Sequence, residues 1–183
     1  MDTIFIDGFS FALPLFIIAI GGIFSEKSGI TNLALEGLQG FGAFVGALVA
    51  TILALGSVKD PFTLMAISLF SAMLGGMAYS MLHGLLCIKF KANQVISGVV
   101  INILAVALTT FFTSLSNTMI VGNASNKFML AVSPRFSIPY LSRIPVVGAL
   151  FKSMYPFEIA ILAIALVAWR MPRRRQRRRR RKQ

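Results

Sequence analysis

The sequence predicts an all-α protein: a polytopic transmembrane helical bundle of about five spans, with one broken or re-entrant helix region. Hydrophobic residues make up 56% of the 183 residues and mean hydropathy is +0.79, more than one soluble core of this size can bury. Four long stretches carry no formal charge: 8–25, 37–58, 61–88 and 92–126. Each can hold the roughly 17 to 25 residues that cross a hydrocarbon layer about 30 Å thick.

We expect five spans within a transmembrane region 1–170. Their approximate ranges are 8–24, 36–56, 62–87, 94–115 and 154–170. The fifth is short, but Tyr155 and Trp169 bracket it as interfacial aromatics do, and Arg170 can extend to the interface. Asp2 and Asp7 stand where a secretory signal would have positive charge, so we expect the first apolar run to remain as a helix.

Small residues predict where the helices pack closely. Such residues recur at three- and four-residue spacing in the third span (Ser71, Ala72, Gly75, Gly76, Ser80 and Gly84) and in the second (Gly42 and Gly46). Stripes of this kind let helix backbones approach one another in a membrane. We therefore interpret them as packing surfaces.

The stretch "GGIFSEKSGITNLALEGLQG", residues 21–40, interrupts the apolar pattern between the first two spans. We expect Gly29 to end the first helix and Asn32 to be the N-cap of the second, with Glu36 one turn later. In some transporters a broken helix places a half-helix N-terminus at the transport pathway. An ordinary polar cytoplasmic turn is the alternative, and the residues alone leave both open.

A narrow polar stripe runs along the predicted fourth span. On a helix, Gln94, Ser97, Gly98, Asn102 and Thr109 fall within about one third of the circumference. Amide side chains in hydrocarbon are costly unless they meet a partner or line a wet cavity. The stripe therefore faces a substrate pathway or forms hydrogen bonds between helices, and these two interpretations carry equal weight.

Nothing in the sequence predicts a catalytic site, a metal site or a cofactor. The single histidine, His83, and the single cysteine, Cys87, have no neighbours at ligand spacing, so both are interpreted as packing residues. The chain also lacks a phosphate-binding loop and other ATPase motifs. We expect that it is not an enzyme.

The last residues, 171–183, form an arginine-rich tail. Nine of the eighteen basic residues lie between Arg173 and Lys182. Positive charge beside a membrane helix favours the cytoplasmic side, so the C-terminus is predicted to be cytoplasmic. Such a tail can also contact anionic lipid or nucleic acid.

Two long motifs, "SEKSGITNLALEG" from Ser25 and "KANQVISGVVIN" from Lys91, resemble signatures of the permease subunits of bacterial nucleoside ABC importers. That family lies within a wider group of ribose and branched-chain amino-acid permeases. The resemblance implies a multi-pass subunit that moves nucleosides across the cytoplasmic membrane. It implies as partners an ATP-binding ABC subunit that hydrolyses ATP, a second permease chain and an extracellular nucleoside-binding lipoprotein, all at the lipid bilayer.

The matching polar positions are assigned by this resemblance. Candidate substrate-pathway residues are Asn32, Gln94, Ser97 and Asn102; candidate structural residues of the broken helix are Ser25, Glu26, Gly29, Glu36 and Asn93. The family pattern stops at about Arg170, which suggests a truncated permease. The alternatives are a permease for a sugar or branched-chain amino acid, and a truncated, non-transporting membrane fragment with a polybasic tail.

Overall fold

The computed structural model describes residues 2–29, 32–56, 58–128, 161 and 167. The chain divides into two compact units, 1–23 with 134–183, and 24–133. The described residues form helices and turns, and no strand occurs among them. The predicted all-α class is confirmed.

The first helix, α1, covers Asp2–Ser28 and is longer than the predicted 8–24. Pro14 lies inside it, a position that membrane helices tolerate better than soluble ones. Gly29 follows with φ of 91°, and its N–H donates to the Glu26 carbonyl at 3.0 Å. A residue in the left-handed region at this place is a common helix stop, so the predicted break at Gly29 is confirmed.

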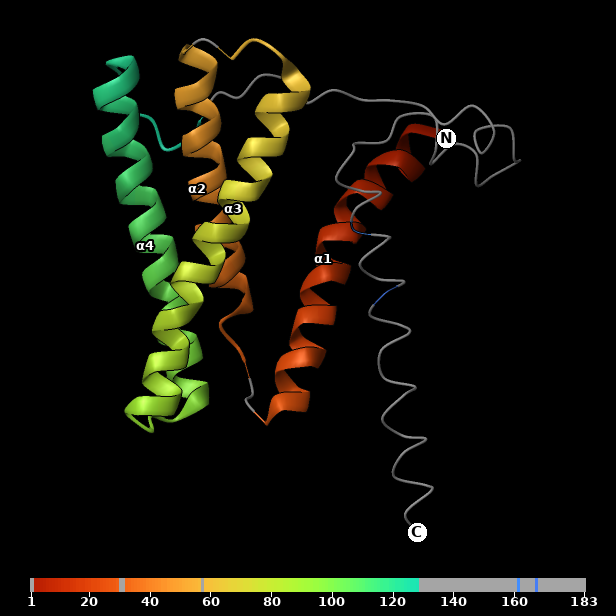
Figure 1. Ribbon diagram of the computed structural model, residues 1–183, viewed down its shortest axis with the longest axis vertical. Coiled ribbons are helices and arrows are strands. Elements are labelled where there is room, and N and C mark those ends of the chain that lie inside the picture. The colour runs from red at the N-terminus through yellow and green to blue at the C-terminus, as the bar shows by residue number, and fades with distance from the viewer. Residues whose placement is uncertain (1, 30–31, 57, 129–160, 162–166, 168–183) are drawn as a thin grey trace. The chain divides into compact units, whose positions relative to one another are not determined.

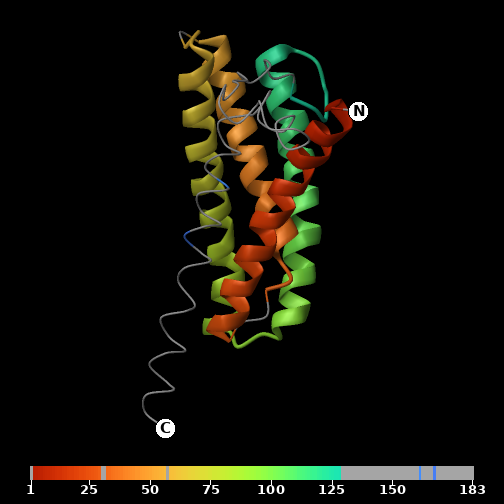
Figure 2. The same cartoon turned by 90° about the vertical axis from the view of Figure 1, so that its right-hand side faces the viewer.

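Three helices of the second unit lie side by side: α2 (Leu35–Leu55), α3 (Pro61–Gly84) and α4 (Gln94–Val121) (Figure 1, Figure 2). α2, α3 with its extension to Lys89, and α4 are long and apolar enough to cross a membrane. The fourth span was predicted to end near 115, whereas α4 continues to Val121. The predicted fifth span, 154–170, lies outside the described residues except for 161 and 167, and the tail, 171–183, lies wholly outside them.

Side-chain caps explain where α3 and α4 begin. Asp60 precedes Pro61 and accepts from the N–H of Thr63 at 2.8 Å. Asn93 accepts from the N–H groups of Val95 and Ile96 at 2.9 and 3.3 Å. In each case a side-chain oxygen satisfies backbone donors that have no partner within the helix.

A π-helical turn, η1 (Leu85–Lys89), continues α3. The N–H of Phe90 donates to the carbonyl of Leu85 at 3.2 Å, five residues earlier. Lys91, with φ of 50°, then turns the chain towards the Asn93 cap. The connection between α3 and α4 is therefore a wide turn followed by a short loop.

Glycines set the close contact between α2 and α3. A Cβ on Gly42 would lie 2.8 Å from the Ala72 carbonyl oxygen, and one on Gly46 would lie 2.9 Å from the Ser68 carbonyl oxygen. A Cβ on Gly75 would lie 2.7 Å from the Val45 side chain. These positions confirm the predicted packing role, whereas Gly84 has no neighbour within 4 Å among the described residues.

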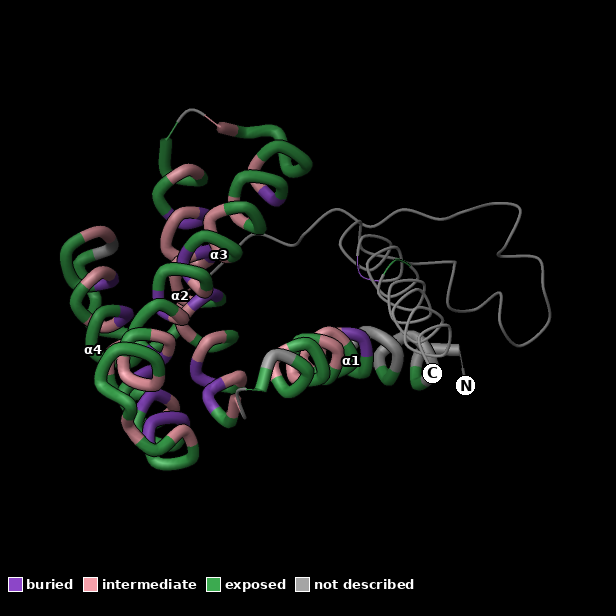
Figure 3. Tube along the Cα trace, turned by 60° about the horizontal axis from the view of Figure 1, so that its bottom comes forward, coloured by how far each residue is buried: buried purple, intermediate pink, exposed green. Residues whose placement is uncertain are grey.

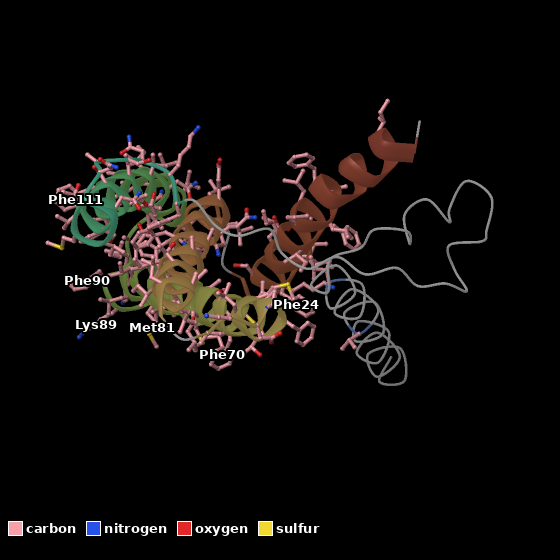
Figure 4. The ribbon with its side chains drawn as sticks, turned by 90° about the horizontal axis from the view of Figure 1, so that it is seen from above. Phe24, Phe70, Met81, Lys89, Phe90 and Phe111 are labelled. Carbon is pink, nitrogen blue, oxygen red and sulfur yellow. The ribbon has the colours of Figure 1, made fainter. Side chains whose placement is uncertain are left out.

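The core of the bundle is small, as expected for helices that also face lipid. Ala34, Tyr79, Ile101 and Ala105 are buried together, and the ring of Tyr79 stacks on Phe41 with centroids 4.4 Å apart. Buried positions are few and lie where the helices face one another (Figure 3). Large apolar side chains, among them Phe70, Met81, Phe90 and Phe111, project outwards from the bundle (Figure 4). This distribution is typical of helices in a bilayer, where lipid-facing surfaces are apolar.

Candidate functional site

The first turn of α2 begins without a cap of its own. Its N-cap residue is Ala34, which has no side-chain acceptor. The prediction that Asn32 is the N-cap is wrong by two residues. Asn32 instead accepts from the N–H of Ala34 at 2.9 Å and so fixes the turn that leads into the helix.

Asn102, in the first third of α4, supplies the missing cap. Its side-chain oxygen accepts from the N–H of Gly37 at 2.8 Å, and its side-chain nitrogen donates to the carbonyl of Leu33 at 2.8 Å. Gly37 is the third residue of α2, and its N–H is one that an N-cap side chain ordinarily satisfies. The side-chain amide of Asn102 thus bonds the backbone on both sides of the start of α2, although it lies 65 positions after Gly37 in the sequence.

Two glycines make this contact possible. A Cβ on Gly37 would lie 2.7 Å from the Asn102 side-chain oxygen and 2.9 Å from its Cα. A Cβ on Gly98 would lie 2.9 Å from the Leu33 Cβ. Larger residues at either position would separate the start of α2 from α4, which would lengthen both Asn102 hydrogen bonds.

A groove of about 210 Å³ lies beside this contact, between α2 and α4. Its lining is Glu36, Gly37 and Gly40 from α2 and Asn102, Ile103, Ala105, Val106 and Thr109 from α4. The groove therefore joins the broken-helix region to the polar stripe of α4. Neither the stripe nor the break alone predicted that Glu36 and Thr109 would line the same space.

A second set of polar contacts, which is buried, joins α4 to α3. The hydroxyl of Ser97 is 3.0 Å from the Nδ1 of His83, and both side chains are only 4% exposed. The hydroxyl of Tyr79 donates to the Ile101 carbonyl at 2.9 Å. Both contacts join α3 to α4 by hydrogen bonds between helices, which agrees with the interpretation of His83 as a packing residue.

The remaining predicted residues are distributed along the chain. Gln94 is the first residue of α4 and is half-buried; Asn93 is its N-cap. Ser25 and Glu26 lie in the last turn of α1, where Ser25 is half-buried and Glu26 is exposed. Of the four candidate pathway residues, only Asn102 lines the groove, and Asn32 lies at the turn that leads into its α2 side. The pathway assignment stays a prediction.

The site roles of three residues were missed in the sequence, although Gly98 was already part of the predicted stripe. Gly37 and Gly98 hold α2 against α4, and Tyr79 anchors α3 to α4. A tyrosine in an apolar run is a usable signal, because its hydroxyl needs a partner when buried. No cluster of three or more metal-ligating side chains occurs among the described residues.

Comparison with known proteins gives this arrangement a context. The chain is 38% identical over 162 residues to the guanosine ABC transporter permease protein NupQ of Bacillus subtilis, covering 87% of this chain and 48% of that protein. It is 32% identical over 161 residues to the nucleoside ABC transporter permease protein NupC of Lactococcus lactis, with the same coverage. It is also 32% identical over 161 residues to the putative glucose ABC transporter permease protein TsgC13 of Haloferax volcanii, covering 85% of this chain and 44% of that protein.

The chain spans about half the length of these curated relatives. No solved structure matches it. The family described as "Branched-chain amino acid transport system / permease component" matches residues 4–175, almost the whole chain. With apolar helices of spanning length and a family match of this extent, the chain is a multi-pass protein of the cytoplasmic membrane that belongs to this permease family.

Proposed function

We propose that the chain is a membrane-spanning permease subunit of an ABC importer that moves nucleosides across the cytoplasmic membrane. The observation that supports this most directly is the groove between α2 and α4, which brings polar groups together between two helices of spanning length, in a chain related to nucleoside permeases. A pathway for a polar solute needs such groups, because hydrocarbon alone excludes it.

The subunit would not itself provide energy. Its relatives are permease components of ABC transporters, so ATP would be hydrolysed by a separate ATP-binding subunit. The other proposed partners are a second permease chain and an extracellular nucleoside-binding lipoprotein. The arginine-rich tail, 171–183, is proposed to lie on the cytoplasmic side and to contact anionic lipid.

The partners can be tested by a pull-down of the chain from its native membranes in mild detergent, with mass spectrometry of the bound proteins. We expect an ATP-binding subunit and a second permease in stable proportion. Recovery of neither would contradict the proposed assembly.

The substrate is tested by uptake of tritiated guanosine in cells that express the chain with the recovered partners. Competition by unlabelled nucleosides, with none by ribose, glucose or leucine, is the expected result. A sugar permease is the second candidate, because the putative glucose permease TsgC13 is as similar in identity as NupC. Competition by glucose, and none by nucleosides, would favour it.

A further inference from the structure

The carboxylate of Glu36 lines the groove, but the contacts that hold α2 against α4 do not explain its presence there. Glu36 is exposed in the first turn of α2, and its side chain has no hydrogen-bond or ion-pair partner among the residues that the structure describes. The start of α2 is already held by Asn32 and Asn102. Beyond the favourable interaction of a first-turn carboxylate with the helix dipole, no contact among the described residues gives Glu36 a part in fixing the broken helix.

Glu36 lies at one end of a helix of spanning length. It is the second residue of the 21-residue helix α2, which at 1.5 Å per residue is just long enough to cross a hydrocarbon layer of about 30 Å. The adjacent N–H of Gly37 is bonded to Asn102, the ninth residue of α4, so this end of α2 is held against a second helix of spanning length. An ionisable side chain that faces a groove between two such helices is a candidate for a substrate or ion pathway.

The chemistry of the groove selects what can bind there. The Glu36 carboxylate only accepts hydrogen bonds, and the hydroxyl of Thr109 donates to the Val106 carbonyl at 3.2 Å, which leaves its oxygen as an acceptor. Ile103, Ala105 and Val106 add an apolar wall. A fitting ligand group therefore has donors on its edge and an apolar face.

The size of the groove limits the fit to part of a solute. Pockets that enclose a whole drug-sized ligand measure about 300 to 1,000 Å³, whereas this groove measures about 210 Å³. It suits one ring of a nucleoside. Two neighbouring donors on such a ring can bind one carboxylate, and a nucleoside offers them as the ribose 2′- and 3′-hydroxyls or as the N1–H and 2-amino group of guanine.

We propose that the groove is a subsite for one ring of the transported nucleoside, with the Glu36 carboxylate as the acceptor for a pair of neighbouring donors. This rests on the proposed function in nucleoside transport. It assigns to Glu36 a role in substrate binding in place of the structural role expected from the sequence.

The test compares Glu36→Gln with Glu26→Gln in initial-rate uptake of tritiated guanosine. Glu26 is a matched control, because it is also an exposed carboxylate but does not line the groove. A hydrogen bond to a charged group corresponds to about tenfold or more in affinity. We expect Glu36→Gln to raise the KM for guanosine about tenfold or more at equal membrane abundance. Glu26→Gln removes no hydrogen bond to the substrate, so we expect it to change KM less than about twofold.

Two analogues identify the donor pair. If Glu36 binds the base, the effect of Glu36→Gln is smaller for inosine, which keeps the N1–H but lacks the 2-amino group, than for guanosine. If it binds ribose, the effect is smaller for 2′-deoxyguanosine, which keeps only the 3′-hydroxyl. An unchanged KM for guanosine, or an equal loss for all three nucleosides, would overturn the proposal.

Equilibrium binding of tritiated guanosine to the purified chain separates this proposal from transport itself. If wild type does not transport guanosine but binds it, and Glu36→Gln weakens that binding about tenfold, the subsite stands and the import function fails. If wild type neither transports nor binds guanosine, the subsite is refuted as well.

Discussion

Replacing Asn102 by leucine tests whether one amide of α4 holds the start of α2. Leucine has a similar volume but forms no hydrogen bond, so the Leu33 carbonyl and the Gly37 N–H both lose their partner. Hydrogen bonds between membrane helices are worth about 0.6 kcal/mol on average and about 1.7 kcal/mol at most. Two such bonds predict a loss of about 1 to 3 kcal/mol in the free energy of unfolding.

The measurement is unfolding of the purified chain by sodium dodecyl sulfate in mixed micelles, followed by circular dichroism. Thr109→Val is the control, because Thr109 lies on the same face of α4 but its hydroxyl bonds only within its own helix. We expect the control to change stability by less than about 0.5 kcal/mol. A change this small in Asn102→Leu would refute the view that Asn102 caps α2.

Two further predictions concern the rest of the bundle. Gly75→Ala places a Cβ 2.7 Å from the Val45 side chain and is expected to lower the free energy of unfolding by about 1 to 3 kcal/mol in the same assay. Adding Val45→Ala to this variant should restore part of the loss, whereas Gly84→Ala, with open space around it, should cost nothing. Equal losses for Gly75→Ala and Gly84→Ala would contradict the packing argument. The hydroxyl and N–H of Thr63 donate to the Asp60 carboxylate and lower its pKa, so the associated stability is present above the ordinary aspartate pKa and is lost as pH falls through the lowered value. Thr63→Val should move the pKa of Asp60 back up in a carbon-13 NMR titration, and an unchanged pKa would show that the hydroxyl does not cause the shift.

The features that were correctly predicted are those that depend on neighbours in sequence. Gly29 ends α1 because a residue with positive φ follows the helix. The cap of α4 by Asn93 is equally local, because its side chain accepts from N–H groups two and three residues ahead, although it was not predicted from the sequence. The helix packing of Gly42 and Gly75 could be read from the spacing of small residues in a membrane segment.

The features that could not be predicted depend on residues far apart in the chain. The cap of α2 was sought in the local residue Asn32, but it comes from Asn102, and nothing in the sequence pairs residues 65 positions apart. The polar stripe of α4 was similarly ambiguous: Ser97 contacts His83, whereas Asn102 and Thr109 line the groove. Only the packing of α3 and α2 against different parts of the stripe separates these roles.

The π-helical turn between α3 and α4 takes up one extra residue without turning the flanking segments relative to each other. Its five residues, Leu85–Lys89, cover about the same rotation as four residues of regular α-helix. Deleting one codon within 85–89 would therefore let the helix continue with regular α geometry while His83 still meets Ser97 and the Asn93 cap is kept. We expect natural variation in the length of this connection to fall within this turn.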